Sequence, residues 1–572
     1  MKKKLAILLG LLILFGSIGC SENEPKKLGT EAMGEFAPED AFLDGAKHPY
    51  YGSENAWNQR FFYEQAERFY KRRGQRAMLE LVKGNIEDAE DYCRDLLEND
   101  PNDLEALFGL VASLANQNKI EEAMVVLEES VSKGLPFSRY IAGPRDILKP
   151  LTDSPEFKDF ALDYKIELIH GPMVGMVTEN SASFWVRTAK ESEVQVRASH
   201  SSKMHMASLT DVKKTSATSN FTAIVTMKDL KPNMVYFYEV LIDGKVAGND
   251  IPSFTTYPAK GDDKKITVVF GGGAGYVPEN ERVWKTIKKH RPLACLWMGD
   301  NVYVNMPENP NAVHYYTYYR RQSRSEFRKL VASTSNYAIW DDHDAATDDV
   351  WLGPYKDKPE WKLPLLDVFK QNWINPFYGT EEWPGTYLNF SIGDVEIFML
   401  DGRFYRTNPF ADNPTMLGPN QKAWLLDALK KSTAIFKVIA SPVPWSYESK
   451  KGAKDTWNGF HDERDEIFNF LSDNKMDGVF LISADRHRSD AWKIERENGY
   501  PLYEFMSSRL TNAHFHPLEP GAMFGYNEKQ SFGKLIFDTK KSDPSVTYEI
   551  YNIDNEKQHS FTLTKSMLSH KE

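Results

Sequence analysis

Five short stretches of this chain collect acidic, histidine and hydroxyl side chains directly after apolar runs. Aspartate and histidine in this pattern suit a metal site better than a serine triad. Carboxylates favour hard cations such as Ca²⁺ or Mn²⁺, whereas histidine and phenolate also admit iron. A pair of close metals with one hydroxide can attack a phosphate ester in line. Each motif alone is weak, since a Gly-Asp after a strand is more often a turn, but five together are not explained by chance. The stretches are Gly299–Tyr303, Trp340–Asp344, Leu400–Arg403, Ser441–Trp445 and Ser483–His487.

The elements expected to position these side chains alternate between strands and helices from about residue 263 onward. In an α/β sheet, ligands bind at the carboxyl ends of the strands, so one site is expected there. The helical stretch is Glu279–His290. The predicted strands are Lys265–Phe270, Leu293–Met298, Ala338–Trp340, Val395–Leu400, Phe436–Ala440 and Gly478–Ile482.

Two further segments precede this α/β region. Residues 166–260 hold short β-rich runs separated by turns, which predicts a small sandwich with a fibronectin type III-like corner. Residues 60–165 have a helical pattern with an internal repeat, in which Ile86–Ala89 recurs 34 residues later as Ile120–Ala123. The repeat looks like two tetratricopeptide units. Such units either bind a protein partner or act as a structural spacer.

Residues 166–540 resemble the PhoD-like alkaline phosphatases of the metallophosphoesterase superfamily. The motifs that carry the resemblance are Gly299-Asp300-x-x-Tyr303, Trp340–Asp344, Leu400–Arg406, Leu417–Leu425, Ser483-Ala484-Asp485-x-His487 and Gly171–Gly175. The resemblance implies an α/β (α+β) fold, in which a β-sandwich is flanked by helices and a two-metal site lies at the strand ends.

The resemblance also implies a role for each matching residue. Asp300 would bridge two metals. Tyr303 and His487 would bind the first metal, which is usually iron. Asp342 and Asp485 would bind the second, calcium-like metal.

Two further residues would act on the phosphate ester. The resemblance implies that His343 faces the substrate and neutralises or protonates the leaving oxygen. Arg403 would bind phosphate or support the ligands, because a guanidinium matches phosphate oxygens. The alternative for Arg403 is a structural salt bridge to a neighbouring aspartate.

One departure from the family leaves the identity of the metal open. The family usually has a cysteine ligand for iron where this chain has Gly273. Loss of a thiolate weakens the preference for iron, and three alternatives follow: water fills the position, a different metal binds, or the site is impaired. Tyr276 could partly substitute for the cysteine. Asp344 replaces the usual glutamate, and Asp348 with Asp349 either draws the second site toward Ca²⁺ or is solvated.

The N-terminus reads as an export signal. Three lysines, an apolar run and small residues precede Cys20, similar to a bacterial lipobox, although an ordinary secretory signal is the alternative. We therefore expect residues 1–19 to be a signal peptide and Cys20 to carry lipid. The expected location is the cell envelope, anchored in the outer membrane and facing the periplasm or the surface. Removing residues 1–19 takes away three lysines and leaves a net charge of about −14.

Composition bounds the remaining possibilities. With 572 residues and 41% hydrophobic residues, the chain should hold about three globular domains. Three cysteines exclude a disulfide scaffold, and Cys93 and Cys295 are expected to be buried. The acidic charge discourages nucleic acid as a partner. The predicted divisions are a signal peptide (1–19), a linker (20–59), a TPR-like segment (60–165), a β domain (166–260) and a catalytic domain (261–572).

These observations favour a lipid-anchored, metal-dependent phosphatase or phosphodiesterase that hydrolyses small phosphate esters with a metal-bound hydroxide. Its cofactors would be two or more metals, Ca²⁺ with Fe³⁺ or another transition metal. One alternative is a degenerate phosphoesterase that serves as a binding lipoprotein. Another is a nuclease or nucleotide phosphodiesterase with the same residues, for which small nucleotides remain possible substrates.

Overall fold

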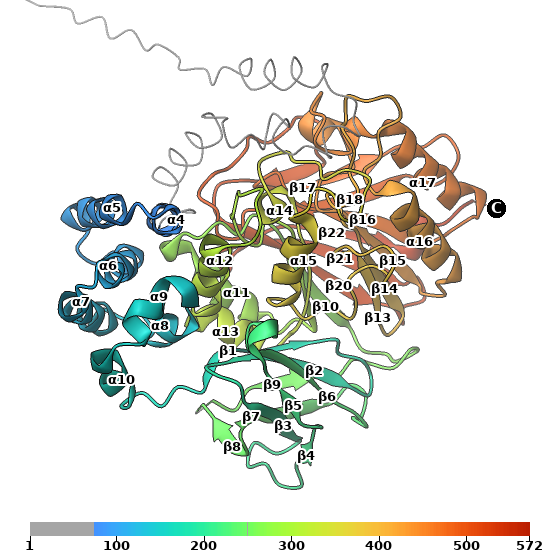
Figure 1. Cartoon of the computed structure of the whole chain (residues 1–572). Helices are drawn as coiled ribbons and strands as arrows, with labels where there is room; N and C mark the ends of the chain where they lie inside the picture. The colour runs from blue at the N-terminus through green and yellow to red at the C-terminus, as the bar shows by residue number, and fades with distance from the viewer. Residues whose placement is uncertain (1–73, 249, 572) are drawn as a thin grey trace, which may run out of the picture.

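The computed structural model describes residues 74–248 and 250–571 (Figure 1). The predictions of a signal peptide, of a linker and of lipid at Cys20 concern residues outside these ranges, as do the first residues of the helical segment. Within the described ranges, no helix is both long and apolar enough to cross a membrane. Cys93 and Cys295 are buried thiols, as expected from the sequence.

The first described segment is helical, and both copies of the 34-residue repeat begin a helix, at Ile86 and at Ile120. Helix α6 packs between α5 and α7, so its residues are buried from Glu105 to Ala115. The Asp103 side chain caps α6 by accepting the N–H groups of Glu105 and Ala106. The helices are α4 (Gln75–Lys83), α5 (Ile86–Asn99), α6 (Leu104–Asn116), α7 (Ile120–Ser132), α8 (Ser138–Ala142), α9 (Arg145–Thr152) and α10 (Pro155–Ala161).

This helical segment packs on α12 (Ala312–Gln322) of the C-terminal domain (Figure 1). Buried Arg139 pairs with Glu105 through two 3.0 Å hydrogen bonds. The hydroxyl of Tyr316, on α12, donates to the same carboxylate over 2.5 Å. The contact joins the helices to the core of the large domain.

The next segment forms two small sheets. One has the order β1-β2-β6, and the other has the order β4-β3-β7-β8 with β5 and β9 at its sides. Tyr236 accepts a 2.9 Å hydrogen bond from the N–H of Lys231 with its hydroxyl, which ties the turn before β7 to that strand. The strands are β1 (Leu168–Gly175), β2 (Ala182–Thr188), β3 (Glu193–Ser199), β4 (Ser208–Leu209), β5 (Lys213–Lys214), β6 (Thr222–Met227), β7 (Val235–Ile242), β8 (Lys245–Ala247) and β9 (Ser253–Thr255).

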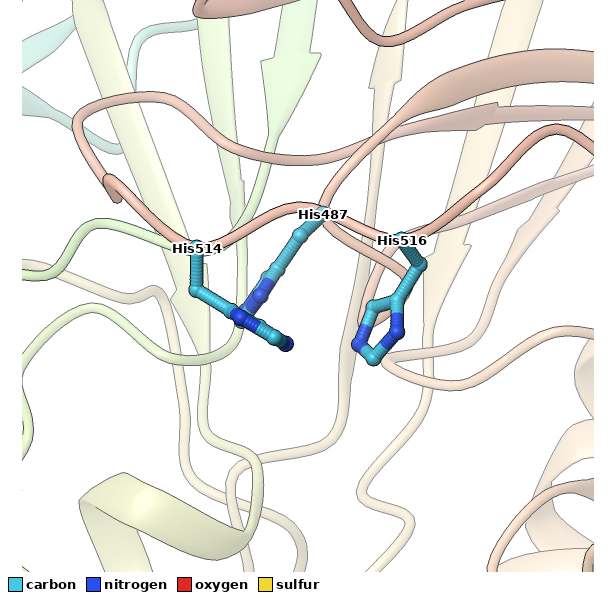
Figure 2. A group of neighbouring side chains, drawn as sticks. All are labelled: His487, His514 and His516. Carbon is cyan, nitrogen blue, oxygen red and sulfur yellow. The ribbon is translucent and has the colours of Figure 1, made fainter. Parts of the chain in front are cut away.

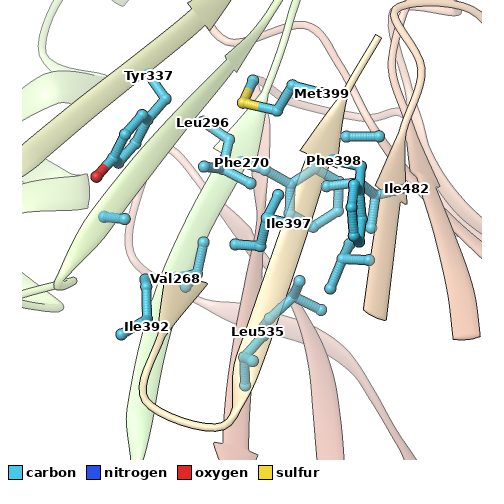
Figure 3. Close-up of a cluster of buried hydrophobic side chains, with 14 of the residues drawn as sticks. Val268, Phe270, Leu296, Tyr337, Ile392, Ile397, Phe398, Met399, Ile482 and Leu535 are labelled. Atoms are coloured by element: carbon cyan, nitrogen blue, oxygen red, sulfur yellow. The ribbon is translucent and has the colours of Figure 1, made fainter. Parts of the chain in front are cut away.

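Two mixed sheets form the large domain. Their orders are β12-β11-β10-β20-β21-β22 and β13-β14-β15-β16-β18-β17-β19. Their facing apolar side chains fill the core, in which Val268, Phe270 and Leu296 of one sheet lie against Ile397 and Ile482 of the other (Figure 3). Helices cover the outer faces (Figure 1): α11 (Val283–Lys289), α12, α13 (Ser325–Val331) and α15 (Lys362–Lys370) lie by the first sheet, and α16 (Gly418–Lys431) and α17 (His461–Asp473) by the second.

The parallel strands of both sheets bring their carboxyl ends to one edge of the domain. Strands β10, β11 and β12 are parallel in one sheet, and β14, β15, β16 and β18 are parallel in the other. The antiparallel strands are β13 (Leu388–Ile392), β17 (Ser489–Ile494), β19 (Phe524–Tyr526), β20 (Ser531–Asp538), β21 (Ser545–Asn552) and β22 (Lys557–Thr564). The parallel ones are β10 (Ile266–Gly271), β11 (Ala294–Met298), β12 (Ser335–Ile339), β14 (Val395–Met399), β15 (Phe436–Ala440), β16 (Val479–Ser483) and β18 (Leu502–Ser507).

Candidate metal centre

The turn after β11 places Asp300 and Tyr303 side by side. The Tyr303 hydroxyl donates a 2.8 Å hydrogen bond to Asp300 Oδ2, and both side chains are buried. Gly299 makes the turn possible, because its φ is +95° and a Cβ there would lie 2.6 Å from the Cβ of Asp341. The absence of that side chain lets the ends of β11 and β12 meet.

Asp344 fastens these two strand ends together. Its carboxylate accepts the backbone N–H groups of Asn301, Val302 and Asp341 at 3.0–3.2 Å. It does so from α14 (Asp342–Ala345), the short helix that follows β12. Asp344 thus positions the turn that carries Asp300, and does so with a shorter side chain than the glutamate that is usual in the family.

Asp342 and His343 extend the site from α14. One ligand atom each of Asp300, Asp342 and His343 lies within 4.8 Å of the others. The imidazole of His343 is held on both sides, since Nδ1 contacts Asn305 Oδ1 and Nε2 lies 3.4 Å from Asp348 Oδ1. The ring of His343 lies 4.4 Å from that of Tyr303. These contacts place His343 at the rim of the acidic group.

Asp348 and Asp349 lie beside the carboxylate of Asp342. Together with Asp342 they form a second group of possible metal ligands, and the N–H of Asp349 donates to Asp342 Oδ2 over 2.8 Å. Asp348 is exposed and Asp349 is half-buried. The structure thus places this acidic pair beside the predicted calcium ligand, and Asp348 also in contact with water.

The turn after β16 brings in Asp485 and His487. His487 Nε2 lies 3.1 Å from the Tyr303 hydroxyl and 3.8 Å from Asp300 Oδ2. Asp300, Asp485 and His487 all adopt left-handed backbone conformations, with φ of 52°, 71° and 45°. Non-glycine residues rarely adopt such conformations, and strain of this kind concentrates at functional sites.

Arg403, from the turn after β14, is fully buried and pairs with an aspartate. Its Nε donates to Asp341 Oδ1 over 2.5 Å, and its Nη1 donates to the carbonyl of Val350 over 3.0 Å. Its Nη2 lies 3.9 Å from Asp342 Oδ1. This is the geometry of the salt-bridge alternative, with one nitrogen directed at a predicted metal ligand.

The buried carboxylates of the site lie close enough to repel one another, and a bound cation would relieve that repulsion. Burial and the carboxylates of Asp342, Asp341 and Asp344 raise the pKa of Asp300 well above its usual value. Burial also raises the pKa of Asp341 to about 8, against the effect of Arg403, and that of Asp344 to about 7. Buried oxygens of Asp300 (Oδ1) and Asp485 (Oδ2) have no hydrogen-bond partner among the described residues. Carboxylates crowded in this way, with a phenol and an imidazole, fit a hard cation next to a transition metal.

Comparison with known proteins agrees with this geometry. The PhoD-like phosphatase family model matches residues 267–552, half of the chain. The chain belongs to the PhoD-like phosphatase family. A domain of unknown function (DUF7800) matches residues 165–255. Alkaline phosphatase D of Bacillus subtilis (strain 168) is 22% identical over 331 residues, which are 50% of this chain and 56% of that protein. The chain thus spans little more than half the length of this curated relative.

Solved structures share the fold. A structure of PhoD aligns with a TM-score of 0.58 and 16% identity, over 70% of this chain and 91% of that one. The purple acid phosphatase PPD1 from yellow lupin (Lupinus luteus) seeds aligns with a TM-score of 0.51 and 13% identity, over 69% of this chain and 75% of that one. The mixed sheets of this PhoD-like protein therefore form a metallophosphoesterase fold, in agreement with the sequence prediction.

The backbone of this PhoD-like protein closes over the position of the missing cysteine. Gly273 has a φ of +67°, and a Cβ there would lie 2.8 Å from both Arg509 N and Ser508 Oγ. It would also lie 3.1 Å from His487 Cδ2, so the position does face the site. Tyr276, the substitute considered from the sequence, packs its ring 4.2 Å from the guanidinium of Arg320.

The segment after β18 supplies residues that the sequence analysis missed. The amide of Asn512 donates to the Tyr303 hydroxyl over 2.6 Å and lies 3.1 Å from His487 Nε2. Two further histidines, His514 and His516, lie beside His487 (Figure 2). No motif marks this segment, but it follows an apolar β-rich run, and that was the signal used at the other strand ends.

Proposed function

We propose that this protein is a metal-dependent phosphoesterase that hydrolyses small phosphate esters, as a phosphatase or a phosphodiesterase. The observation that carries the proposal is the convergence of acidic, phenolic and imidazole side chains from three strand ends. Family membership and the shared fold support it. The net negative charge disfavours nucleic acid and leaves nucleotides and other small esters as substrates.

The residues divide into two ligand sets that share Asp300. Tyr303 and His487 would join Asp300 in holding a transition metal, and Asp342 and Asp485 would join it in holding a Ca²⁺-like ion. Cations held there would activate water and neutralise charge on the phosphate oxygens. Asp348 and Asp349 would add carboxylate oxygens to the second set, since Ca²⁺ accepts six to eight.

His343 and Arg403 would act in different ways. His343 is positioned by Asn305 and Asp348 at the rim of the acidic group, where it can donate a proton to a leaving oxygen. Arg403 would act as a positioning residue, because its guanidinium is engaged by Asp341 and directs one nitrogen toward Asp342.

The test is hydrolysis of p-nitrophenyl phosphate and bis(p-nitrophenyl) phosphate by the full-length protein, loaded with a series of metals. Asp300→Asn should lower kcat by roughly 1,000-fold or more, since several kcal/mol of charge stabilisation depend on the metals. Asp211→Asn, on the surface of the β domain, is the matched control. Folded protein that binds almost no metal and hydrolyses neither ester would favour the degenerate binding lipoprotein instead.

We also propose that the protein is lipid-anchored through Cys20 in the cell envelope, and that the helical segment can bind a protein partner with the surface that faces away from α12. The sequence around Cys20 and the repeat support these two proposals. A Cys20→Ala variant that still partitions with membranes, or that still takes up labelled fatty acid, would contradict the anchor.

A further inference from the structure

A second group of possible metal ligands lies beside the acidic one and consists only of histidines. One nitrogen each of His487, His514 and His516 lies within 4.8 Å of the others. The ring centroids are 4.6–5.5 Å apart. Figure 2 shows the three rings on the same side of their loops, directed into a common space. Three imidazoles that converge in this way are a common ligand set for a transition metal.

The local backbone explains why two of these rings face the same way. His514 and His516 are two residues apart in an irregular segment between β18 and β19, and neither belongs to a helix. Phe515, between them, is 54% exposed, with the guanidinium of Arg509 above its ring at 5.0 Å. In an extended chain, alternate side chains point to opposite sides, so a Phe515 turned outward leaves both histidines turned inward.

The three histidines are withdrawn from solvent to different degrees. His487 is buried, and His514 and His516 are half-buried. A metal bound among them would take the neutral form of each ring.

The same segment covers the position of the missing thiolate. The N–H groups of Thr511 and Asn512 donate to the carbonyl of Gly273 at 3.2–3.3 Å, and Ser508 Oγ occupies the space of a side chain at Gly273. One continuous stretch thus closes the cysteine position and carries two imidazoles to His487. Imidazole in place of thiolate suits Zn²⁺ and similar divalent metals.

We propose that His514 and His516 join His487 as ligands of the transition metal of the centre, and that this metal is a divalent ion of the Zn²⁺ class beside Asp300 and Tyr303. This deepens the proposed function, on which it rests for the acidic part of the centre. In a tetrahedral site with metal–nitrogen distances of ~2.0–2.1 Å, ligand nitrogens are roughly 3.4 Å apart. Small side-chain rotations of the two loop histidines would bring the three nitrogens to that spacing.

The test uses full-length protein stripped of metal and titrated with Co²⁺ alone, followed by its visible absorption, and with Zn²⁺ by equilibrium dialysis. The wild type should bind one equivalent with a d–d band typical of nitrogen ligands. The double variant His514→Ala/His516→Ala should lose the band and bind that equivalent at least roughly 100-fold more weakly. His200→Ala, which changes an exposed histidine of the β domain, should behave as wild type.

Two further variants separate this inference from the proposed function. Asp342→Asn should abolish hydrolysis and keep the Co²⁺ band, because Asp342 belongs to the acidic group. If the double variant does not fold, as judged by circular dichroism, the single His516→Gln variant decides. Unchanged Co²⁺ and Zn²⁺ binding in folded His514 and His516 variants would overturn the inference. If the wild type shows the band, the His514 and His516 variants lose it, and the wild type hydrolyses neither ester, the inference stands and the phosphoesterase proposal is overturned.

Discussion

Gln75, the first residue of α4, donates a 2.7 Å hydrogen bond to the backbone carbonyl of Tyr303, in the turn that carries two predicted metal ligands. Its amide also donates to Thr317 Oγ1 over 2.7 Å, and the side chain is fully buried. The N-terminal helices therefore reach the metal centre directly, across 228 residues of sequence.

The first prediction concerns this contact. Gln75→Ala should destabilise the protein by about 1–3 kcal/mol, because two buried hydrogen bonds are lost. The substitution should also weaken metal binding at temperatures well below that of unfolding, since the turn that carries Asp300 and Tyr303 loses the hydrogen bond from Gln75. Denaturant unfolding and metal titration measure the two effects. Gln117→Ala, in the turn between α6 and α7, is the control, and metal affinity unchanged in Gln75→Ala would show that the contact is only structural.

The second prediction concerns proton donation by His343. His343→Ala should lower kcat roughly 100-fold for an alkyl phosphate, whose leaving oxygen needs a proton, and much less for p-nitrophenyl phosphate. Steady-state assays of both esters give the ratio, with His200→Ala as the control. Equal losses for both esters would mean that His343 positions other groups and does not donate the proton.

The third prediction concerns Gly273. Gly273→Ala should cost about 2–4 kcal/mol, because a left-handed backbone and a 2.8 Å approach to Arg509 N act together. Gly244→Ala is a matched control, since its φ is +76° and nothing lies within 4 Å of the added Cβ, so it should cost only about 1 kcal/mol. Equal costs in thermal unfolding would mean that the segment after β18 moves aside. For the same steric reason, a Gly273→Cys variant loaded with iron should not show the absorption band of an iron thiolate.

The fourth prediction concerns pH and a residue outside the site. Burial and the charge of Arg187 hold the pKa of His170 well below its usual value, and Arg187 Nη1 donates to His170 Nδ1 over 2.9 Å. The unfolded chain takes up this proton near pH 6.5 and the folded one does not, so the contribution to stability is present above pH 6.5 and is lost as the pH falls.

Unfolding of the metal-free protein between pH 7.5 and 5 measures this contribution. Its slope should include up to about 1.4 kcal/mol per pH unit below pH 6.5 from His170. His170→Asn should remove that part of the slope, and His200→Ala should not. A slope that is the same in His170→Asn and in the wild type would assign the acid sensitivity to other groups.

Much of the site could be predicted because its ligands follow apolar strands in a fixed order. Asp300, Asp342 and His487 were located from the ends of β11, β12 and β16, and the structure places them together. The sequence does not show whether Arg403 binds phosphate or pairs with an aspartate, since its burial and pairing depend on how two distant turns meet. The structure pairs it with Asp341.

The parts that could not be predicted depend on contacts without a local pattern. Asn512, His514 and His516 lie in an irregular segment, where neither periodicity nor a motif indicates which way a side chain points. Gln75 reads as an ordinary helix residue, and its role arises only when α4 packs on α12. The closure over Gly273 likewise depends on backbone atoms of Arg509, which no residue type reveals.

The shared packing of α6 and α12 has a practical consequence for anyone who wishes to express this protein. Phe108 and Tyr316 lie in one continuous core, and the carboxylate of Glu105 accepts from both Arg139 and Tyr316. A chain cut to begin at residue 166 would open that core to water and leave Tyr316 without its acceptor. We therefore expect the stretch that carries the family resemblance to be less stable without the helices in front of it, and expression of the protein to benefit from keeping them.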